Sequence, residues 1–403
     1  MRQGESLEGR PVRVLIAGGG TGGHVYPAAT TAQRLREVLA EQGREVSLTW
    51  LGSPGRLEER VAAQNGVEFL PIATGKLRRG RTPLHAITWT NLRDLGRAGN
   101  GAVQAWSIVR RRRPDVVVGF GGYVALPVGT AAWLARRPLV VHEQTVRLGL
   151  ANRLLARLAR VFAVSSASTL PLLPRRARAR AELVGNPIRP ELSRGEADRA
   201  IPALGLEGFD RALPTVYVTG GAMGARQINS VLSDSLPWLL ERANVVHQCG
   251  ETDHEEQLKR AASLPAALAP RYRLLPFIGP ELPDVYALAD LVVARSGAGT
   301  IAELTALGKP ALLIPLASSA GGEQARNARH LADNGAARML TGTFGGEEFR
   351  AALEPLLAEP AARKGMSAKA RALGRPDAAD ALARLILRVV EDRGGRGAQT
   401  RGV

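Results

Sequence analysis

Three short glycine-rich stretches in this chain stand where an anionic ligand could bind. The first is Gly-Gly-Gly-Thr-Gly-Gly at 18–23, which follows the apolar run Val12–Ala17 and precedes an amphipathic stretch. The second, 220–224, follows the apolar run Val216–Thr219, and the third is 295–300. A strand that leads into a glycine turn and a helix presents backbone N–H groups and the positive end of the helix dipole to a phosphate. The pattern therefore predicts nucleotide or diphosphate binding at these turns.

His24 directly follows the first glycine stretch, at the predicted start of a helix. A helix N-terminus disfavours the imidazolium form and keeps the ring neutral. A neutral imidazole in that place suits a general base that takes a proton from an attacking hydroxyl group. A histidine that only caps the turn explains the same position, so both interpretations stay open.

Glu303 has two compatible interpretations. It falls in the first turn of a helix predicted over Ile301–Leu307, and Thr300 stands three residues earlier, which is the spacing of a capping box. In the second interpretation, Gly297 and Gly299 hold a diphosphate while the Glu303 carboxylate accepts both hydroxyl groups of a ribose.

The first stretch also satisfies Gly-x-Gly-x-x-Gly, through Gly18, Gly20 and Gly23. A dehydrogenase requires in addition an acidic residue about 20 positions later, to hold the ribose. Here the second apolar run, Val46–Leu51, is followed by Gly-Ser-Pro-Gly-Arg. Arg56 would serve an NADP enzyme instead, so the oxidoreductase interpretation is weakened but not excluded.

The elements that position these residues alternate between short apolar runs and helical patterns, which indicates parallel sheets flanked by helices. The pattern restarts near residue 215, so we expect two Rossmann-like halves joined near the turn signal Gly-Asn-Pro. The expected domains are 1–188 and 189–375, with a C-terminal helix, 376–392, that completes the first, and a disordered tail at 393–403. Further strands are predicted at Val116–Gly119, Leu139–Val141, Val161–Val164, Val245–Gln248, Leu291–Ala294 and Ala311–Pro315.

Composition agrees with two packed domains in a cytosolic protein. The chain has 403 residues, 45% of them hydrophobic, which is more than a single core usually supports. The single cysteine, Cys249, excludes a disulfide framework and a cysteine-based metal cage. No apolar run approaches the roughly 18 residues of a membrane-spanning helix, and the first residues lack the apolar stretch of a signal peptide.

The net charge of +17 is carried by arginine, because all but five of the 54 Lys and Arg residues are Arg. Guanidinium groups pair with phosphate in a bidentate manner, so this composition suits phosphate ligands or anionic surfaces. Aromatic residues make up only 4% and are not interleaved with basic residues in the way that stacks bases. Nucleic-acid binding is therefore not expected.

Six motifs then appear in a fixed order: the stretch 18–28, Gly-Gly-Tyr-Val at 121–124, His-Glu-Gln at 142–144, Val-Gly-Asn-Pro-Ile-Arg at 184–189, Arg-Ser-Gly-Ala-Gly-Thr-Ile-Ala-Glu at 295–303 and Glu-Gln-Ala-Arg-Asn-Ala at 323–328. Together they resemble the MurG family of peptidoglycan N-acetylglucosaminyltransferases, from about Arg13 to Leu385. The resemblance implies a GT-B fold, in which two Rossmann-like domains with parallel sheets face a cleft. It also implies inverting transfer of N-acetylglucosamine from UDP-N-acetylglucosamine to lipid I (undecaprenyl-diphospho-N-acetylmuramoyl-pentapeptide), giving lipid II in peptidoglycan synthesis.

The resemblance assigns the UDP-sugar donor to the C-terminal half and the polyprenyl-diphosphate-linked acceptor to the N-terminal half. In the donor half, Glu303 would bind the ribose and Ile278 the uracil, and Arg189 would meet the diphosphate. The diphosphate and sugar would be lined by Ala298, Gly299, Thr300, Gln324 and Asn327. The acceptor would face Thr21, Gly22, Gly23, His24, Tyr123 and Glu143. His24 is the first candidate for the general base and Glu143 the second.

Three positions depart from the family pattern. Ala222 stands where a serine is expected near the donor phosphate, Met223 replaces the usual Gln or Arg, and Thr145 replaces an asparagine that would contact the sugar. These changes leave open a weakened or non-catalytic relative, or a glycosyltransferase that acts on another lipid, such as a diacylglycerol. No Asp-x-Asp pair occurs, so neither a metal nor another cofactor is expected, and the leaving-group charge would fall to a helix end and Arg189.

The segment from Ile72 to Arg113 mixes basic and apolar residues. Basic side chains near an anionic leaflet contribute roughly 1 kcal/mol each, and tryptophan favours the membrane interface. An ordinary surface helix explains the same pattern, but the implied lipid acceptor favours peripheral contact with an anionic membrane at the cytoplasmic face of the inner membrane. The residues are Lys76, Arg78, Arg79, Arg81, Arg93 and Arg97 among Ile87, Trp89, Leu92, Leu95 and Trp106.

Overall fold

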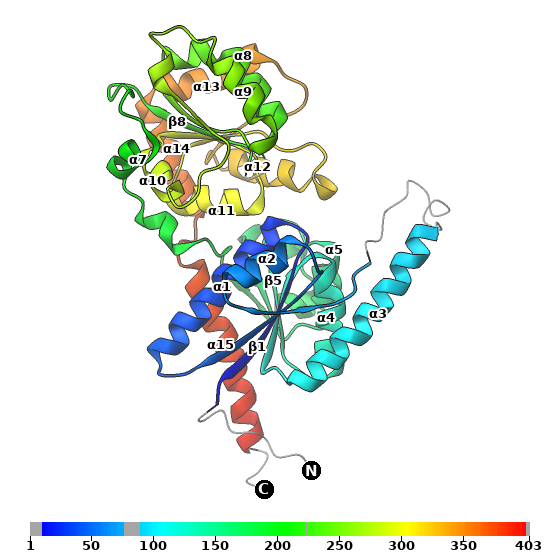
Figure 1. The fold of residues 1–403 in the computed structure, drawn as a ribbon. Helices are drawn as coiled ribbons and strands as arrows, with labels where there is room; N and C mark the ends of the chain where they lie inside the picture. Colours follow the sequence, from blue (N-terminus) through cyan, green and yellow to red (C-terminus); the bar gives the residue numbers. More distant parts are fainter. Residues whose placement is uncertain (1–9, 76–88, 222–223, 400–403) are drawn as a thin grey trace. The chain divides into compact units, whose positions relative to one another are not determined.

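A computed structural model describes residues 10–75, 89–221 and 224–399. The chain divides into two compact units, one comprising Met1–Ile188 with Asp377–Val403 and the other Arg189–Pro376. Each unit contains one sheet, and every strand pairing in both sheets is parallel (Figure 1). The predicted α/β fold with two Rossmann-like domains is therefore confirmed.

The first unit contains a seven-stranded sheet in the order β3-β2-β1-β4-β5-β6-β7. Its inner strands are runs of buried aliphatic residues, as expected where helices cover both faces of a parallel sheet. One hydrophobic core joins the sheet to α1, α2 and α15, and a second joins it to α3, α4 and α5. The strands are β1 (Val12–Gly18), β2 (Val46–Gly52), β3 (Glu68–Pro71), β4 (Val116–Gly121), β5 (Leu139–Glu143), β6 (Val161–Val164) and β7 (Ala181–Leu183). The helices are α1 (Gly22–Glu41), α2 (Leu57–Gln64), α3 (Trp89–Arg112), α4 (Gly122–Leu134), α5 (Leu150–Leu155), η2 (Ala167–Leu172), α6 (Arg175–Arg178) and α15 (Ala378–Gln399).

The second unit contains a six-stranded sheet in the order β10-β9-β8-β11-β12-β13. A hydrophobic core joins its central strands to α8, α13 and Met366 of α14. The strands are β8 (Thr215–Thr219), β9 (Asn244–Gln248), β10 (Tyr272–Leu275), β11 (Leu291–Ala294), β12 (Ala311–Leu313) and β13 (Arg338–Met339). The helices are η3 (Pro190–Arg194), α7 (Ala197–Leu204), α8 (Arg226–Leu240), η4 (Glu251–Asp253), α9 (His254–Ala261), η5 (Ala269–Arg271), α10 (Leu282–Leu288), α11 (Ala298–Leu307), η6 (Ala320–Gly322), α12 (Glu323–Asp333), α13 (Gly346–Ala358) and α14 (Pro360–Leu373).

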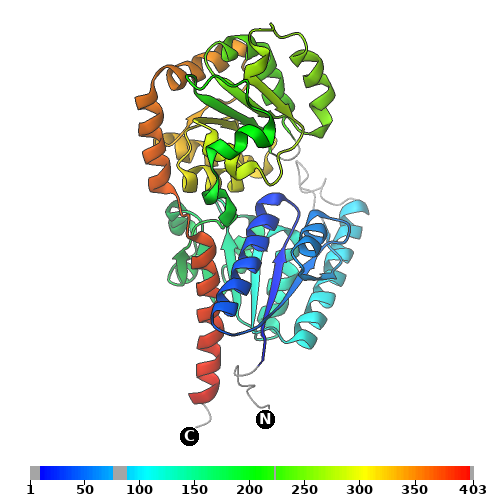
Figure 2. The same cartoon turned by 60° about the vertical axis from the view of Figure 1, so that its left-hand side comes forward.

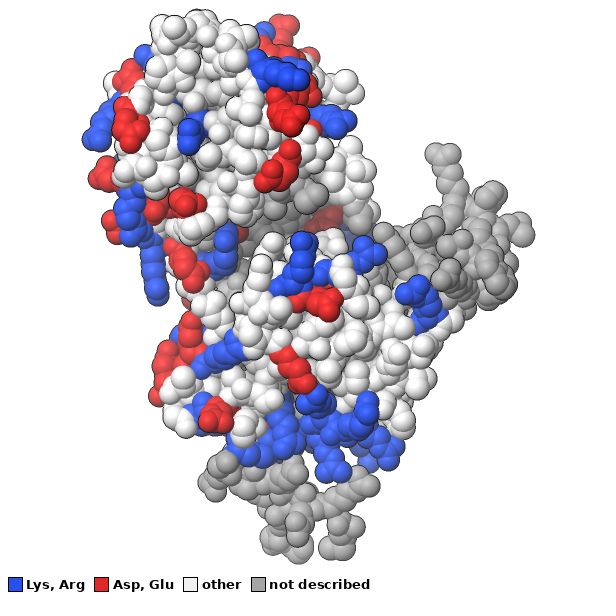
Figure 3. All heavy atoms as spheres, in the orientation of Figure 1, with Lys and Arg blue, Asp and Glu red and all other residues white. Residues whose placement is uncertain are grey.

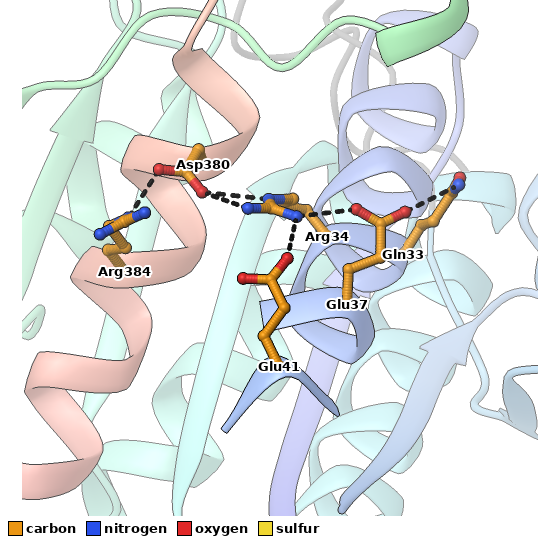
Figure 4. Close-up of polar contacts among 6 residues, drawn as sticks. All are labelled: Gln33, Arg34, Glu37, Glu41, Asp380 and Arg384. Atoms are coloured by element: carbon orange, nitrogen blue, oxygen red, sulfur yellow. Dashed lines mark hydrogen bonds and ion pairs between the residues drawn. The ribbon is translucent and has the colours of Figure 1, made fainter. Parts of the chain in front are cut away.

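The final helix, α15, lies along α1 in the first unit, and Figure 2 shows the two helices side by side. Arg34 of α1 donates from Nε and Nη2 to Asp380 Oδ1, at 3.0 and 2.8 Å, and also contacts Glu37 and Glu41 (Figure 4). Arg384 bonds the other oxygen of Asp380. Apolar side chains of α15, among them Leu382 and Ile386, are buried in the core beneath this ion-pair network. A segment from the end of the chain thus completes the unit formed by its beginning.

Both sheets reverse their strand order beside their first strand. β1 has β2 on one side and β4 on the other, and β8 has β9 and β11 as its neighbours. In open parallel sheets, ligands bind beyond the carboxyl ends of the strands at such a point of reversal. In the first unit this point carries the turn after β1 and Gly121-Gly122 after β4. In the second unit it carries Gly220-Gly221 after β8 and Arg295-Ser296-Gly297 after β11.

The structure differs from the sequence expectations in three ways. Helix α11 begins at Ala298, three residues before its predicted start, and the tail predicted to be disordered from 393 instead continues α15 through Gln399. Strands β3, β7, β10 and β13 were not predicted. All four are short, partly exposed strands at a sheet edge, so their sequences lack a continuous apolar run.

Some predicted residues cannot be placed. Ala222 and Met223 lie outside the described residues, as do Lys76, Arg78, Arg79, Arg81 and Ile87 of the predicted membrane segment. Trp89, Leu92, Arg93 and Leu95 belong to helix α3.

Candidate active site

In the first unit, the turn after β1 and the turn after β4 meet backbone to backbone. Gly122 has φ +76°, and a Cβ atom there would lie 2.3 Å from the carbonyl oxygen of Gly19. Only glycine allows both this conformation and this approach. Gly20 has φ +90°, and a Cβ atom there would lie 3.0 Å from the hydroxyl oxygen of Tyr123, whose side chain is 41% exposed. Tyr123 therefore lies over the glycine turn, on the face where an acceptor was predicted.

His24 lies in the first turn of α1, and its ring is fixed by the preceding turn. Its Nδ1 lies 3.2 Å from the carbonyl oxygen of Gly19 and 3.2 Å from Thr21 Oγ1. Because a carbonyl oxygen only accepts, Nδ1 carries the proton in this geometry and Nε2 is left as the basic nitrogen. Burial lowers the pKa of His24, although the Gly19 carbonyl and the charge of Glu58 oppose that shift. The ring is thus neutral near pH 7, as a general base must be.

Thr21 occupies the N-cap position of α1, but its hydroxyl group makes no hydrogen bond to the backbone N–H groups of the helix. Gly22 and Gly23 form the first turn, where N–H groups lack intrahelical partners. A Cβ atom at Gly22 would meet the ring of Tyr26, whereas one at Gly23 would have only Thr21 Oγ1 within 4 Å. The backbone of this turn is therefore open on the side of Gly23.

Glu143, the second candidate for the base, has its carboxylate oxygens engaged within the protein. Oε1 accepts hydrogen bonds from the Thr145 N–H and hydroxyl groups at 3.3 and 2.9 Å. Oε2 accepts from the Gly149 N–H at 2.9 Å and from Asn152 Nδ2 at 3.1 Å. Burial raises the pKa of Glu143, opposed by these same donors. A carboxylate with four donors orders the loop after β5 and has little capacity left to accept a substrate proton.

The single hydroxyl proton of Thr145 is shared between Glu143 Oε1 and the carbonyl oxygen of Arg147, so this hydroxyl group serves the same loop. His142 is buried beside Phe120, and its Nε2 lies 2.8 Å from the carbonyl oxygen of Gly185. Burial lowers the pKa of His142 to about 4, so this histidine is neutral and structural. His24 and Asn152 approach the same point, because a Cβ atom at Gly121 would lie 3.0 Å from His24 Nε2 and 3.6 Å from Asn152 Nδ2, the group that donates to Glu143 Oε2.

Glu58 was missed by the sequence analysis, although it is fully buried beneath the first glycine turn. Its carboxylate accepts from the N–H groups of Gly20 at 3.3 Å and Ser53 at 3.2 Å. A Cβ atom at Gly19 would lie 2.5 Å from Glu58 Oε1. The Gly20 N–H predicted to face a phosphate is thus occupied by an internal carboxylate. The only sequence signal was an acidic residue in the first turn of a helix, which usually lies on the surface.

In the second unit, the turn after β11 leaves space around its glycines. A Cβ atom at Gly297 or Gly299 would meet no atom within 4 Å. Gly297 is the N-cap of α11 and no side chain caps the helix, so the N–H groups of Gly299 and Thr300 remain available to an anion. Ala298 is the first residue of the helix and is buried.

Glu303 does not form the predicted capping box with Thr300, because α11 begins at Ala298 and places Glu303 in its second turn. Its Oε2 accepts a hydrogen bond from the hydroxyl group of Tyr286 at 2.8 Å. Burial raises the pKa of Glu303, whereas Tyr286 and the positive charge of Arg189 oppose that shift. Arg189 is exposed just before η3, and its positive charge favours the ionised form of Glu303.

Three further residues predicted to bind the donor make hydrogen bonds within the protein. Asn327 is buried, and its Nδ2 donates to the carbonyl oxygen of Ser296 at 3.1 Å, so it supports the turn. Gln324 accepts the Leu316 N–H through Oε1 at 2.9 Å. The Ile278 N–H donates to Gln248 Oε1 at 3.0 Å, which leaves the Ile278 carbonyl oxygen as the group that could meet a nucleobase.

Gln248, at the end of β9, was also missed by the sequence analysis. Its Nε2 donates to Thr219 Oγ1 at 3.2 Å and to the carbonyl oxygen of Gly221 at 3.0 Å, while its Oε1 accepts from Ile278. One buried amide thus ties the turn after β8 to the segment after β10. Nothing in the local sequence distinguishes it from other glutamines.

The chain has two Rossmann-like units with glycine turns at their points of strand reversal. The first unit places a neutral histidine at its turn, and the second places an uncapped helix and a carboxylate. This combination is a feature of GT-B glycosyltransferases. Family models agree with this class: the glycosyltransferase family 28 N-terminal domain matches residues 14–164 and the family 28 C-terminal domain matches residues 215–382. The chain belongs to glycosyltransferase family 28, within the MurG proteins.

Two curated relatives carry the name UDP-N-acetylglucosamine–N-acetylmuramyl-(pentapeptide) pyrophosphoryl-undecaprenol N-acetylglucosamine transferase. The relative from Halorhodospira halophila is 40% identical over 92% of this chain and 96% of its own length. The relative from Moorella thermoacetica is 38% identical over 94% of this chain and all of its own length. Among solved structures, Acinetobacter baumannii MurG matches with a TM-score of 0.71 and 28% identity, covering 94% of this chain and all of that one.

Proposed function

We propose that this protein transfers N-acetylglucosamine from UDP-N-acetylglucosamine to lipid I and so forms lipid II in peptidoglycan synthesis. The observation that carries the proposal is the full-length similarity to transferases named for this reaction, at 40% identity over 96% of one relative. The two glycine turns and the residues around them supply the chemical groups that such a transfer requires.

The second unit is the proposed donor site. The uncapped N-terminus of α11, through Gly299 and Thr300, receives the diphosphate, because unpaired N–H groups and the helix dipole favour an anion. Glu303 accepts the ribose hydroxyl groups, and the Ile278 carbonyl oxygen meets the uracil. Ala298 and Gln324 line the sugar, while Asn327 keeps the turn in place from behind.

The first unit is the proposed acceptor site, with His24 as the general base. The 4-hydroxyl oxygen of the acceptor sugar forms a bond to the anomeric carbon of N-acetylglucosamine, on the face opposite the bond to UDP. The carbon–oxygen bond to UDP breaks, UDP leaves with the electron pair, and the hydroxyl proton passes to His24 Nε2. The product therefore has the inverted configuration. The helix end and Arg189 stabilise the charge on UDP, so the reaction is proposed to need no metal or other cofactor.

Membrane contact is proposed for the helix α3 and α4 side of the first unit. Val103 and Trp106 of α3 and Trp133 and Leu134 of α4 are exposed, the last two at 54% and 57%. Arg110 lies over the ring of Trp106, 5.1 Å from its centroid. Lys and Arg side chains gather where α3 ends, as Figure 3 shows, and include Arg111, Arg112 and Arg113, all exposed.

Exposed tryptophans beside arginines favour the interface of an anionic bilayer. Within the part of the chain that the structure describes, no helix is long and apolar enough to cross a membrane. We therefore propose peripheral attachment at the cytoplasmic face of the inner membrane, where a UDP-sugar and a polyprenyl-linked acceptor would meet.

One assay tests the proposal directly. The purified protein is incubated with UDP-N-acetylglucosamine and either a lipid I analogue or diacylglycerol, each with and without EDTA, and UDP release is measured. We expect release with lipid I only, at a rate that EDTA leaves unchanged. Release with diacylglycerol instead would assign a different lipid acceptor, and no release with either would indicate a non-catalytic relative.

A further inference from the structure

Tyr286 of α10 and Glu303 of α11 form a hydrogen-bonded pair in the second unit. The Tyr286 hydroxyl donates to Glu303 Oε2 at 2.8 Å, and its side chain is only 3% exposed. The Tyr286 ring packs edge-on against Tyr217 of β8, with ring centroids 5.6 Å apart and an interplanar angle of 88°. Packing of this kind fixes the ring, so the hydroxyl group is held in one place beside the carboxylate.

The direction of this hydrogen bond follows from the ionisation of both groups. Burial and the charge of Glu303 raise the pKa of Tyr286 well above its ordinary value, so the phenol stays protonated. An ionised carboxylate only accepts, so the phenol is the donor. The bond lowers the pKa of Glu303 against the effect of burial, and so favours the ionised form.

The other carboxylate oxygen is left for a ligand. Within the described residues, Glu303 Oε1 has no hydrogen-bond partner, and the carboxylate does not cap α11. A carboxylate offers about four lone-pair positions, of which Tyr286 takes one. The free positions on one carboxylate match the two adjacent hydroxyl groups of a ribose.

We propose that Tyr286 is a positioning residue that holds the Glu303 carboxylate in the orientation in which it accepts the 2′- and 3′-hydroxyl groups of the nucleotide ribose. The inference rests on the proposed function, because it assigns Glu303 to the nucleotide. It extends that function to a residue that lies outside all six sequence motifs and that touches no ligand itself.

The charged and titratable groups around Glu303 are few. Arg189 acts on it from the segment before η3, and Tyr286 acts on it from α10, with Tyr217 of β8 behind. η3, with Glu191 and Arg194, also packs against α11, as do α12 and α14, but Arg189 is the only charged group among the described residues that shifts the pKa of Glu303. Glu323 and Arg326 of α12 act on each other, and Arg371 of α14 lies beside Gly308, beyond the far end of α11.

The test compares two ligands and two variants by isothermal titration calorimetry at pH 7.5. The ligands are UDP and 2′,3′-dideoxy-UDP, which lacks both hydroxyl groups assigned to Glu303. For Tyr286→Phe we expect UDP binding to weaken by about 10-fold, because a Glu303 carboxylate that is no longer held in place makes poorer hydrogen bonds to the ribose. Binding of dideoxy-UDP should change by less than about 2-fold, because the contact that Tyr286 supports is already missing.

Tyr272→Phe is the matched control. Its hydroxyl group lies 2.8 Å from His247 Nδ1 in the same unit, away from Glu303, so the substitution also removes one half-buried phenol oxygen. It should leave the affinity for both ligands unchanged. If Tyr286→Phe weakens both ligands equally, or neither, the positioning role is wrong.

The pH dependence of UDP affinity gives a second readout, which would not change if Tyr286 had a purely structural role. UDP affinity of the unaltered protein should fall as the pH drops through the pKa of Glu303. In Tyr286→Phe the fall should begin at a higher pH, because the bond that lowered this pKa is gone. The titration of UDP itself is common to both proteins and cancels. Superimposable profiles would contradict the proposal.

Failure of the proposed function gives a different result. If the unaltered protein binds neither nucleotide, the donor assignment itself is wrong, and the inference about Tyr286 is wrong with it. If it binds UDP and dideoxy-UDP equally, UDP is a ligand but Glu303 does not contact the ribose. That outcome overturns the positioning role alone.

Discussion

The two units present glycine turns at equivalent points of their sheets but treat the surrounding polar groups differently. In the first unit, the Gly20 N–H is bonded to Glu58, and Glu143 accepts four hydrogen bonds from its own loop. In the second unit, Gly297 and Gly299 face open space, and within the described residues Glu303 has one hydrogen-bond partner, Tyr286. A turn whose polar groups are satisfied internally is preorganised, whereas a turn with unsatisfied groups gains most from a ligand. From this comparison we expect the second unit to bind the anionic ligand and the first unit to position the base.

The largest expected effect would follow from removing that base. His24→Ala should lower turnover by 10²–10⁴-fold, because a positioned general base contributes about that factor. UDP affinity should remain close to the starting value, since His24 belongs to the other unit. The measurement is steady-state kinetics with lipid I analogue, together with UDP titration.

The pH–rate profile sharpens this prediction. Burial lowers the pKa of His24, and the base works only when neutral, so activity should be lost as the pH falls through a value below 6.5. His24→Ala should lack this acid limb. His254→Ala, a histidine in α9 of the second unit, should keep both the rate and the limb. More than about a third of the activity remaining in His24→Ala would assign His24 to positioning only.

Glu303→Ala tests the open site of the second unit. UDP binding should weaken by about 100-fold, because two hydrogen bonds to a charged group are lost. The thermal stability of the unliganded protein should change little, since removing the buried Glu303 carboxylate offsets the loss of its hydrogen bond from Tyr286. The measurement pairs calorimetric UDP titration with thermal unfolding.

Glu348→Ala provides the opposite case in the same unit. The Glu348 side chain accepts from the Gly345 N–H at 2.9 Å and so caps helix α13. Its removal should lower the free energy of unfolding, because the Gly345 N–H loses its partner, and leave UDP affinity unchanged. If Glu303→Ala behaved like Glu348→Ala, the contrast between an open and a satisfied carboxylate would fail.

Glu143→Gln tests the satisfied site of the first unit. In either orientation the amide places its NH2 group against one pair of donors, from Thr145 or from Gly149 and Asn152, so the free energy of unfolding should fall by roughly 1–3 kcal/mol. Urea unfolding measures the change, and Glu45→Gln, at an exposed position, should shift it by less than about 0.5 kcal/mol. A stable Glu143→Gln protein without activity would instead return Glu143 to the list of candidate bases.

The smallest expected effect is on membrane binding, and it tests whether the basic surface of the first unit is responsible for that binding. Arg136 is exposed just after the end of α4. Replacing Arg111, Arg113 and Arg136 with Gln should reduce co-sedimentation with anionic vesicles several-fold, since each basic residue contributes roughly 1 kcal/mol or less. Binding of the unaltered protein should decrease as salt rises through the screening range. Equal binding to neutral vesicles would remove the electrostatic part of the proposal.

A charge-matched control comes from the second unit. Replacing the exposed residues Arg211, Arg273 and Arg329 with Gln removes the same number of charges. This triple variant should bind anionic vesicles nearly as well as the unaltered protein. If both triple variants lost binding equally, net charge rather than a surface of the first unit would explain the attachment.

The central strands, the glycine turns and the family membership of this chain could be predicted from the sequence, because each depends on local signals. Buried parallel strands are continuous apolar runs, glycine at a positive φ angle is required by the turn itself, and six ordered motifs identify the family. The edge strands β3, β7, β10 and β13 lacked such a signal. Their residues become strands only because a neighbouring strand offers hydrogen bonds at the sheet edge.

The state of each carboxylate was decided only by the tertiary structure. Glu58, Glu143 and Glu303 are alike in the sequence, yet one anchors a turn, one is saturated by a loop and one is held by a tyrosine 17 residues away. The sequence also places Arg34 and Asp380 at opposite ends of the chain, although they form an ion pair at 2.8 Å. Hydrogen-bond partners and burial depend on which segments the fold brings together, and these long-range contacts leave no periodic trace in the sequence around each residue.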